Sequence, residues 1–161
     1  MDELHIQALE VRVLAGIIAR LAGRDLERSL AASNLPISAL QYGVLRRLSH
    51  DDATISELSA SMLLSPATLV PAVDALERKG LVRRARDTLD RRRKSLTLTG
   101  VGARFLADIS ASTSDENVAR SLACMGGAKS QVLNGLLREL LSEMTQDPGL
   151  ADRVVNQYVS P

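Results

Sequence analysis

Apolar residues recur at helical spacing over the first part of the chain, and charged residues fill many of the positions between them. The apolar stripe consists of Leu14, Ile17, Ile18, Leu21, Leu26 and Leu30. Spacings of three and four residues place such side chains on one face of a helix. The pattern therefore predicts a long amphipathic helix over residues 4–32, either continuous or divided near Gly23.

Two further helices are predicted at capping boxes, in which a serine or threonine caps the helix start and a residue three positions later reaches back. Ser38 with Gln41 opens a helix whose apolar residues extend to Leu48. Thr54 with Glu57 opens a shorter helix. Both starts are specified by residues that are close neighbours in the chain.

A third short helix is predicted to begin at Ser65, because serine followed by Pro66 is a typical helix start. It is expected to end at Gly80, a residue favoured just after a helix. Two helices joined by a short turn within residues 54–79 have the spacing of a helix-turn-helix. Pro71 lies inside the second of them, where proline costs about 3 kcal/mol, so a bent helix is expected.

After Gly80 the pattern changes from helical to alternating. Residues 81–86 and 94–98 are predicted strands on either side of a charged tip, because Leu96 and Leu98 alternate with polar residues. The sequence thus predicts a β-hairpin directly after the helix-turn-helix.

The C-terminal third is predicted to be helical again, from Thr99 onward, with a break at Gly126 and an end at Pro148. A last short helix is expected over residues 150–158. The richest apolar stripe of the chain lies between residues 132 and 144. It is either an internal core helix or, with the N-terminal helix, part of a two-fold interface.

The composition excludes several classes of function. Three aromatic residues are too few for base-stacking platforms, and one cysteine excludes internal disulfides and structural zinc clusters. Cys124 is expected to be a buried packing residue rather than a redox sensor. No nucleophile–base pair, phosphate loop or metal-ligand spacing is visible, so neither an enzyme nor a cofactor is predicted. No apolar run approaches the roughly 18 residues of a membrane span, and a cytoplasmic protein is expected.

Charge is distributed unevenly along the chain. The 20 basic and 19 acidic residues give a formal net charge of +1, yet nine basic and two acidic residues lie between Arg78 and Lys94. This basic segment carries +7, and the rest of the chain carries −6. A concentrated basic hairpin neutralises phosphates and releases counterions whatever the total charge. Beside a helix-turn-helix, it favours duplex binding over a merely solvated hairpin.

An ordered set of short motifs spans residues 37–102. It consists of Ile37-Ser38-x-x-Gln41-Tyr42-x-Val44-Leu45, Thr54-x-x-Glu57-Leu58, Leu64-Ser65, Thr68-Leu69-x-Pro71, Leu76-Glu77-x-Lys79-Gly80-Leu81-Val82-x-Arg84, Asp90-Arg91-Arg92 and Leu98-Thr99-x-x-Gly102. In this order and spacing the set resembles the MarR family of winged helix-turn-helix transcriptional regulators.

The resemblance implies a mainly α fold with a small β-hairpin wing, in which a winged helix-turn-helix core is flanked by long N- and C-terminal dimerisation helices. Residues 33–99 would be the DNA-binding domain, and residues 1–32 with 100–161 would form the dimer. It further implies a homodimeric repressor that binds double-stranded DNA at a pseudopalindromic operator and is often released by a small ligand.

In the predicted recognition helix, Leu69, Val73 and Leu76 share one face and are expected to pack inward. The residues expected to meet DNA are Ser65, Ala67, Thr68, Val70, Pro71 and Arg78. None of them offers the bidentate hydrogen bonds that read guanine or adenine, apart from Arg78 at the far end of the helix. Readout is therefore expected to use thymine methyl groups and DNA shape, and Asp74 on the outward face is expected to repel phosphate.

The wing residues expected to meet DNA are Arg84, Arg86, Arg91, Arg92, Arg93 and Lys94. By resemblance, Arg92 is the tip arginine that enters the minor groove, and Asp90 holds the loop by ion pairing. Because successive side chains of a strand point to opposite faces, the arginines of the first strand cannot all face DNA. At least one of them is expected to pair with Asp87 or Asp90.

Two partners besides DNA are expected: a second copy of the chain, and a small aromatic or amphipathic effector bound between the dimer helices and the winged domain. No cofactor, metal or membrane partner is predicted. The alternative is a winged-helix module that binds proteins and has no significant DNA binding. Val70, Pro71 and Asp74 favour this alternative, and the charge of the basic segment opposes it.

Overall fold

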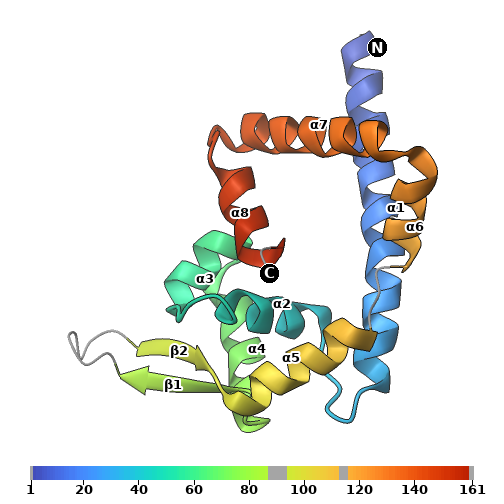
Figure 1. The fold of residues 1–161 in the computed structure, drawn as a ribbon. Coiled ribbons are helices and arrows are strands. Elements are labelled where there is room, and N and C mark those ends of the chain that lie inside the picture. Colours follow the sequence, from blue (N-terminus) through green and yellow to red (C-terminus); the bar gives the residue numbers. More distant parts are fainter. Residues whose placement is uncertain (1, 87–93, 113–115, 160–161) are drawn as a thin grey trace.

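The computed structural model describes residues 2–86, 94–112 and 116–159, which form eight helices and one antiparallel hairpin (Figure 1). In chain order the elements are α1 (Glu3–Ala32), α2 (Ala39–Leu48), α3 (Ile55–Met62), α4 (Pro66–Arg78), β1 (Val82–Arg86), β2 (Lys94–Leu98), α5 (Gly100–Ser112), α6 (Glu116–Met125), α7 (Gly127–Thr145) and α8 (Leu150–Val159). The predicted fold class, mainly helical with a two-stranded wing, is confirmed.

Both predicted capping boxes are present. The hydroxyl of Ser38 accepts the backbone N–H of Gln41 at 3.2 Å, and the Gln41 side chain accepts the Ser38 N–H at 3.0 Å. Thr54 and Glu57 make the same exchange at 3.2 and 2.7 Å. α1 is continuous through Gly23, which settles the alternative left open by the sequence.

The hairpin is attached to the loop between α2 and α3 through Leu96. The Leu96 N–H donates to the carbonyl of Ala53 at 2.8 Å, and the Ala53 N–H donates to the Leu96 carbonyl at 3.2 Å. The Thr97 hydroxyl adds a hydrogen bond to the Asp52 carboxylate at 2.8 Å. Because the Leu96 side chain is also buried, the root of the wing is fixed by backbone pairing and by core packing together.

One hydrophobic core joins the helix-turn-helix to its neighbours. Its fully enclosed members include Val44, Leu45, Leu58, Leu69, Val73, Leu76, Leu81 and Leu96. Leu30 from the last turns of α1 and Phe105 from α5 belong to the same cluster. The winged unit is therefore packed directly against both flanking segments, and the division into domains at residues 33 and 99 stays a prediction.

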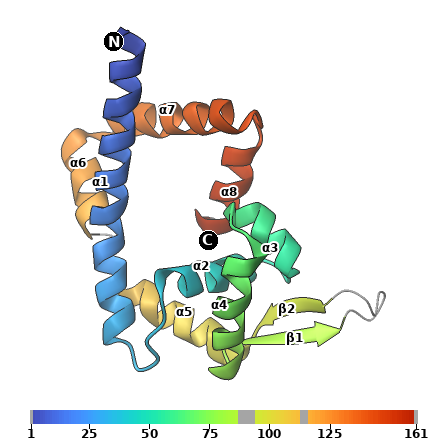
Figure 2. The ribbon, with the colours of Figure 1, turned by 180° about the vertical axis from the view of Figure 1, so that it is seen from behind.

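The remaining helices extend away from this core. α1, α7 and α8 form three sides of an open frame above the winged unit, and the two opposite views agree on this arrangement (Figures 1 and 2). α7 joins α6 to α8, and α8 turns back to contact α2 and α3. The 19 residues of α7 include none that is buried within the single chain.

Among the described residues, no single helix is long and apolar enough to cross a membrane; only the sharply bent pair α3 and α4 passes that test jointly, by length and composition alone.

The start of α5 lies tightly against the end of the α4–β1 turn. The Thr99 hydroxyl donates to the Gly80 carbonyl at 2.7 Å and accepts the Gly102 N–H at 3.0 Å. A Cβ atom at Gly102 would lie 2.3 Å from the Leu81 carbonyl oxygen and 2.7 Å from a Leu98 methyl carbon. Only glycine permits this close approach of helix and strand.

We therefore expect Gly102→Ala to lower the free energy of unfolding by about 3 kcal/mol, since backbone must move to admit one methyl group. Urea denaturation at fixed protein concentration measures the loss. Gly100→Ala is the matched control, because nothing lies within 4 Å of its added Cβ atom. Equal stability of the two variants would contradict the close approach described here.

Candidate nucleic-acid interface

The helix-turn-helix consists of α3 and α4, whose axes are bent by 117° at the turn between them. This angle lies in the range typical of the motif. Leu63 adopts a left-handed conformation, with φ at 53°, and the Leu64 N–H donates to the Ser59 carbonyl at 3.1 Å. The left-handed residue and this hydrogen bond together form the turn, so that the chain changes direction between α3 and α4.

The two faces of α4 differ as the sequence predicted. Leu69, Val73 and Leu76 are fully buried, which confirms the inward face. The six residues expected to meet DNA, namely Ser65, Ala67, Thr68, Val70, Pro71 and Arg78, are all exposed. Their contact with DNA stays a prediction.

The first turn of α4 presents two hydroxyl groups. Ser65 caps the helix by accepting the Thr68 N–H at 3.3 Å, and the two hydroxyls lie 2.9 Å apart. Pro66 occupies the first helical position, where its missing N–H costs nothing. The hydrogen bonds that cap the helix also hold the hydroxyls of Ser65 and Thr68 in place at its exposed start.

Pro71 does not end α4, which continues to Arg78. Since proline has no N–H, the carbonyl of Ala67 receives no hydrogen bond from position 71. Both residues lie on the exposed side. Pro71 therefore does not break the helix, which keeps a proline on its outward face.

Arg84 on β1 is paired with α4. Its guanidinium donates to the carboxylates of Asp74 and Glu77, and its backbone N–H donates to Glu77 at 3.2 Å. The hydrogen bond to Asp74 is the main reason why the pKa of Arg84 is raised above its already high ordinary value, despite partial desolvation. The sequence instead expected an arginine of this strand to pair with Asp87 or Asp90, which lie outside the described residues.

The hairpin projects from the winged end of the molecule, on the side opposite α1 (Figures 1 and 2). In the register, Arg84 faces Leu96 and Arg86 faces Lys94 at the outer end of the strands. Asp90, Arg91, Arg92 and Arg93 belong to the segment 87–93, outside the described residues. The structure therefore positions the root of the wing, and the roles of these four residues stay predictions.

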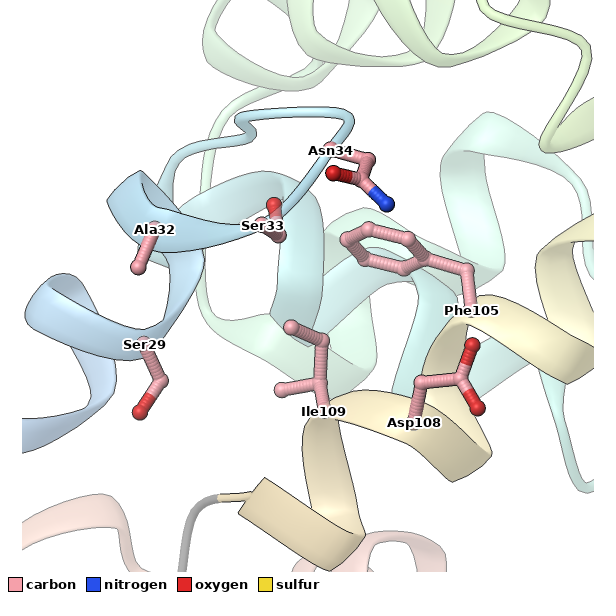
Figure 3. Close-up of a pocket in the computed structure, with 7 residues that line it drawn as sticks. All are labelled: Ser29, Ala32, Ser33, Asn34, Phe105, Asp108 and Ile109. Carbon is pink, nitrogen blue, oxygen red and sulfur yellow. The ribbon is translucent and has the colours of Figure 1, made fainter.

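A cavity of about 350 Å³ lies between the end of α1 and α5 (Figure 3). It is lined by Ser29, Ala32, Ser33, Asn34, Phe105, Asp108 and Ile109. The Phe105 and Ile109 side chains are buried on its α5 side, and Asp108 is the lining residue that bears a charge. The effector pocket expected from the sequence, between the dimer helices and the winged domain, had no named lining residues, and it stays a prediction.

Cys124 is exposed in α6, so the expectation of a buried packing residue is wrong for the single chain. Its neighbours Ala123 and Met125 are exposed as well. An apolar local sequence indicated burial, but the last residues of α6 are uncovered within the single chain. The error arises because local composition does not specify which part of a helix other elements cover.

Comparisons with known proteins agree with this geometry. The sequence profile of the MarR family matches residues 37–94. The solved structure of a MarR family protein from Bacillus stearothermophilus is 31% identical, with 90% of this chain and 99% of that chain covered and a TM-score of 0.66. The chain belongs to the MarR family. The resemblance drawn from the motifs is thereby confirmed.

Two further solved relatives of this MarR-family chain are each 25% identical to it. The transcriptional regulator BldR from Sulfolobus solfataricus covers 89% of this chain and 99% of its own length, with a TM-score of 0.68. CouR from Rhodococcus jostii, solved bound to p-coumaroyl-CoA, covers 83% and 90%, with a TM-score of 0.67. No curated protein sequence matches significantly.

Membership of the MarR family makes the protein a transcriptional regulator and not an enzyme. The family also implies DNA binding and a homodimer. The Arg84 pairing could have been suspected from the sequence, because Glu77 and Arg84 both belong to one of the motifs that carry the resemblance. Asp74 stands outside that motif, and the cavity residues come from segments some 70 positions apart.

Proposed function

We propose that this MarR-family regulator is a ligand-responsive repressor that binds a pseudopalindromic operator as a homodimer. The observation that carries the proposal is the exposed face of α4 beside the basic segment of residues 78–94. An exposed helix enters the major groove, while clustered arginines and lysines neutralise phosphates. α4 and β1, on which the described part of the basic segment begins, are consecutive elements that share one hydrophobic core.

We assign the first turns of α4 to the major groove. Ser65 and Thr68 supply hydroxyls, and Ala67, Val70 and Pro71 supply apolar contacts suited to thymine methyl groups. Arg78, at the far end of the helix, is assigned to a phosphate. Sequence discrimination on this helix then depends more on shape and methyl contacts than on bidentate hydrogen bonds.

The wing supplies the remaining affinity in this proposal. Arg92 enters the minor groove, where narrow segments attract arginine electrostatically, and Asp90 holds the loop. Arg86, Arg91, Arg93 and Lys94 are assigned to phosphates. The net charge of −6 outside the basic segment disfavours nonspecific coating of DNA by other surfaces.

Dimerisation through residues 1–32 and 100–161 is supported by exposed apolar side chains on α1 and α7. On α7 these are Val132, Leu136, Leu137, Leu140 and Met144, with exposed fractions from 40% to 75%. On α1, Leu14, Ile17, Ile18 and Leu21 are exposed as well. Patches of this kind mark protein interfaces, and a two-fold axis would place two α4 helices about 34 Å apart on DNA.

The cavity between α1 and α5 is our candidate effector site. Its volume lies within the range of roughly 300–1,000 Å³ typical of small-molecule pockets. Phe105 and Ile109 suit an aromatic or amphipathic body, and the aromatic acyl ligand of the relative CouR is compatible with such a body. The carboxylate of Asp108 favours an effector that ends in an amine or hydroxyl over one that ends in a carboxylate.

A genomic selection tests DNA binding. Fragmented genomic DNA retained by the wild-type protein is sequenced, and the selected duplex is used in fluorescence anisotropy over a range of salt. Arg92→Ala should weaken binding by about 1–3 kcal/mol and lower the salt slope by about 1, as expected for a groove-inserted cation. Arg46→Ala, on α2, removes the same charge outside the wing and the dimer segments and should leave the salt slope unchanged. No wild-type binding even at low salt would favour the protein-interaction module.

Leu136→Asp tests the dimer. A carboxylate in the middle of the apolar face of α7 should dissociate the protein to monomers, because an unpaired charge is costly to bury in an interface. Sedimentation velocity measures the change, and operator affinity should fall with it. Leu63→Asp, at an exposed apolar residue in the turn between α3 and α4, lies outside the dimer segments and should leave the dimer intact. A dimeric Leu136→Asp variant would contradict this interface.

Calorimetric titration with phenethylamine and with 3-phenylpropionate tests the effector site. The amine should bind the wild type more tightly, and Asp108→Asn should reduce that preference by about fivefold, the size expected for a partly exposed ion pair. Asp51→Asn, on an exposed carboxylate in the α2–α3 loop, is the control. An unchanged preference in Asp108→Asn would overturn the assignment of Asp108.

A further inference from the structure

We propose that Arg84 is a positioning residue that fixes the recognition helix α4 against the wing, and that it does not itself contact DNA. The inference rests on the proposed function, since it assigns a role within DNA binding. It also replaces the sequence-based assignment of Arg84 to the DNA-contacting residues of the wing.

The first observation is the fork that Arg84 forms. One terminal nitrogen of its guanidinium donates to Asp74 and the other to Glu77, so one planar group spans two positions that lie three residues apart on α4. Arginine is suited to this arrangement because its donors point in fixed directions. The fork joins β1 to the C-terminal half of the helix at two points.

A third bond comes from the backbone of the same residue. Arg84 lies opposite Leu96 in the hairpin, but the N–H and carbonyl of Leu96 are both bonded to Ala53. The Arg84 N–H therefore faces away from β2, as in a non-hydrogen-bonded pair of an antiparallel ladder. It donates to Glu77 at 3.2 Å, so the edge of β1 is bonded to α4 through main chain and side chain together.

The charges of Arg84, Asp74 and Glu77 also support a positioning role. Asp74 and Glu77 alone would place two negative charges beside the proposed DNA-binding face, and Arg84 reduces their sum to −1. Its guanidinium is thereby committed to carboxylates rather than left for a phosphate. Asp74, expected from the sequence to repel phosphate, instead anchors the helix to the strand.

The exposure of the three side chains indicates what this arrangement contributes. They are 32%, 42% and 36% exposed for Arg84, Asp74 and Glu77, and ion pairs at such sites add little to stability. The contribution is therefore geometric. Arg84 lies two residues before the end of β1, so a small rotation of β1 against α4 would be amplified at the wing tip.

A first experiment needs no DNA. Amide hydrogen exchange, corrected for intrinsic rates, is measured at residue 84 by NMR in the wild type and in two variants. Arg84→Ala should accelerate exchange by about tenfold, because Glu77 loses the partner that holds its carboxylate in place. Arg83→Ala removes the same charge from the opposite face of β1 and should leave this amide unchanged. An unchanged rate in Arg84→Ala overturns the proposal.

A second experiment uses the duplex selected by the wild-type protein. Arg84→Ala should weaken binding by about fivefold without lowering the salt slope, and its melting temperature should fall by less than about 4 °C. The same substitution should have little further effect in an Asp74→Asn/Glu77→Gln background, because the fork is already lost. A slope lower by about 1, with an undiminished effect in that background, would show a phosphate contact and overturn the proposal.

The Arg84→Lys variant distinguishes a fork to two carboxylates from a simple charge contact with a phosphate. Lysine keeps the charge but reaches one carboxylate at a time, so it should recover only part of the affinity, whereas it would replace a phosphate contact almost fully. Full recovery would therefore contradict the fork. If the wild type selects no duplex, the proposed function fails, and the exchange experiment still decides whether Arg84 holds β1 to α4.

Discussion

The placement of the candidate DNA-binding surface depends on the burial of one face of α4. Leu69, Val73 and Leu76 are fully enclosed in the core that also contains Leu96 of the hairpin. Because interiors are close-packed, α4 cannot rotate without displacing these side chains. The same packing that stabilises the winged unit therefore determines which residues of α4 face outward and where the wing begins.

The positive charge of the chain is concentrated in one segment rather than spread along the sequence. The basic segment carries +7 in a chain whose total is +1, so the positive charge available to a duplex is concentrated in one short stretch of the sequence. The apolar residues left exposed on α1 and α7 lie on the flanking helices instead. Hydrophobic and electrostatic interactions are thus assigned to different parts of the chain, which suits a protein that binds a copy of itself and a polyanion at once.

Features determined by near neighbours were predictable from the sequence. The capping boxes at Ser38 and Thr54 each require only a residue three positions away, and both are present. The inward face of α4 follows from helical spacing. Features that depend on tertiary contacts were not predictable in this way: the partners of Arg84 follow from the docking of β1 on α4, and the exposure of Cys124 follows from how α6 is packed. The cavity at Phe105 joins segments that only the fold brings together.

In the proposed binding mode, the chemistry of α4 makes its orientation relative to the wing important. The first turns of α4 expose two hydroxyls and small apolar side chains, which offer few hydrogen bonds with which to distinguish bases. In the proposed binding mode, discrimination then depends on the shape and deformability of the duplex, which are sensed as the energy of fitting DNA to a surface of fixed geometry. A wing free to rotate against α4 would adapt to many duplex shapes and lose that discrimination. Exposed ion pairs such as those of Arg84 contribute little to folding, yet in the role proposed for them they suit this purpose, because they join β1 to the helix at two points.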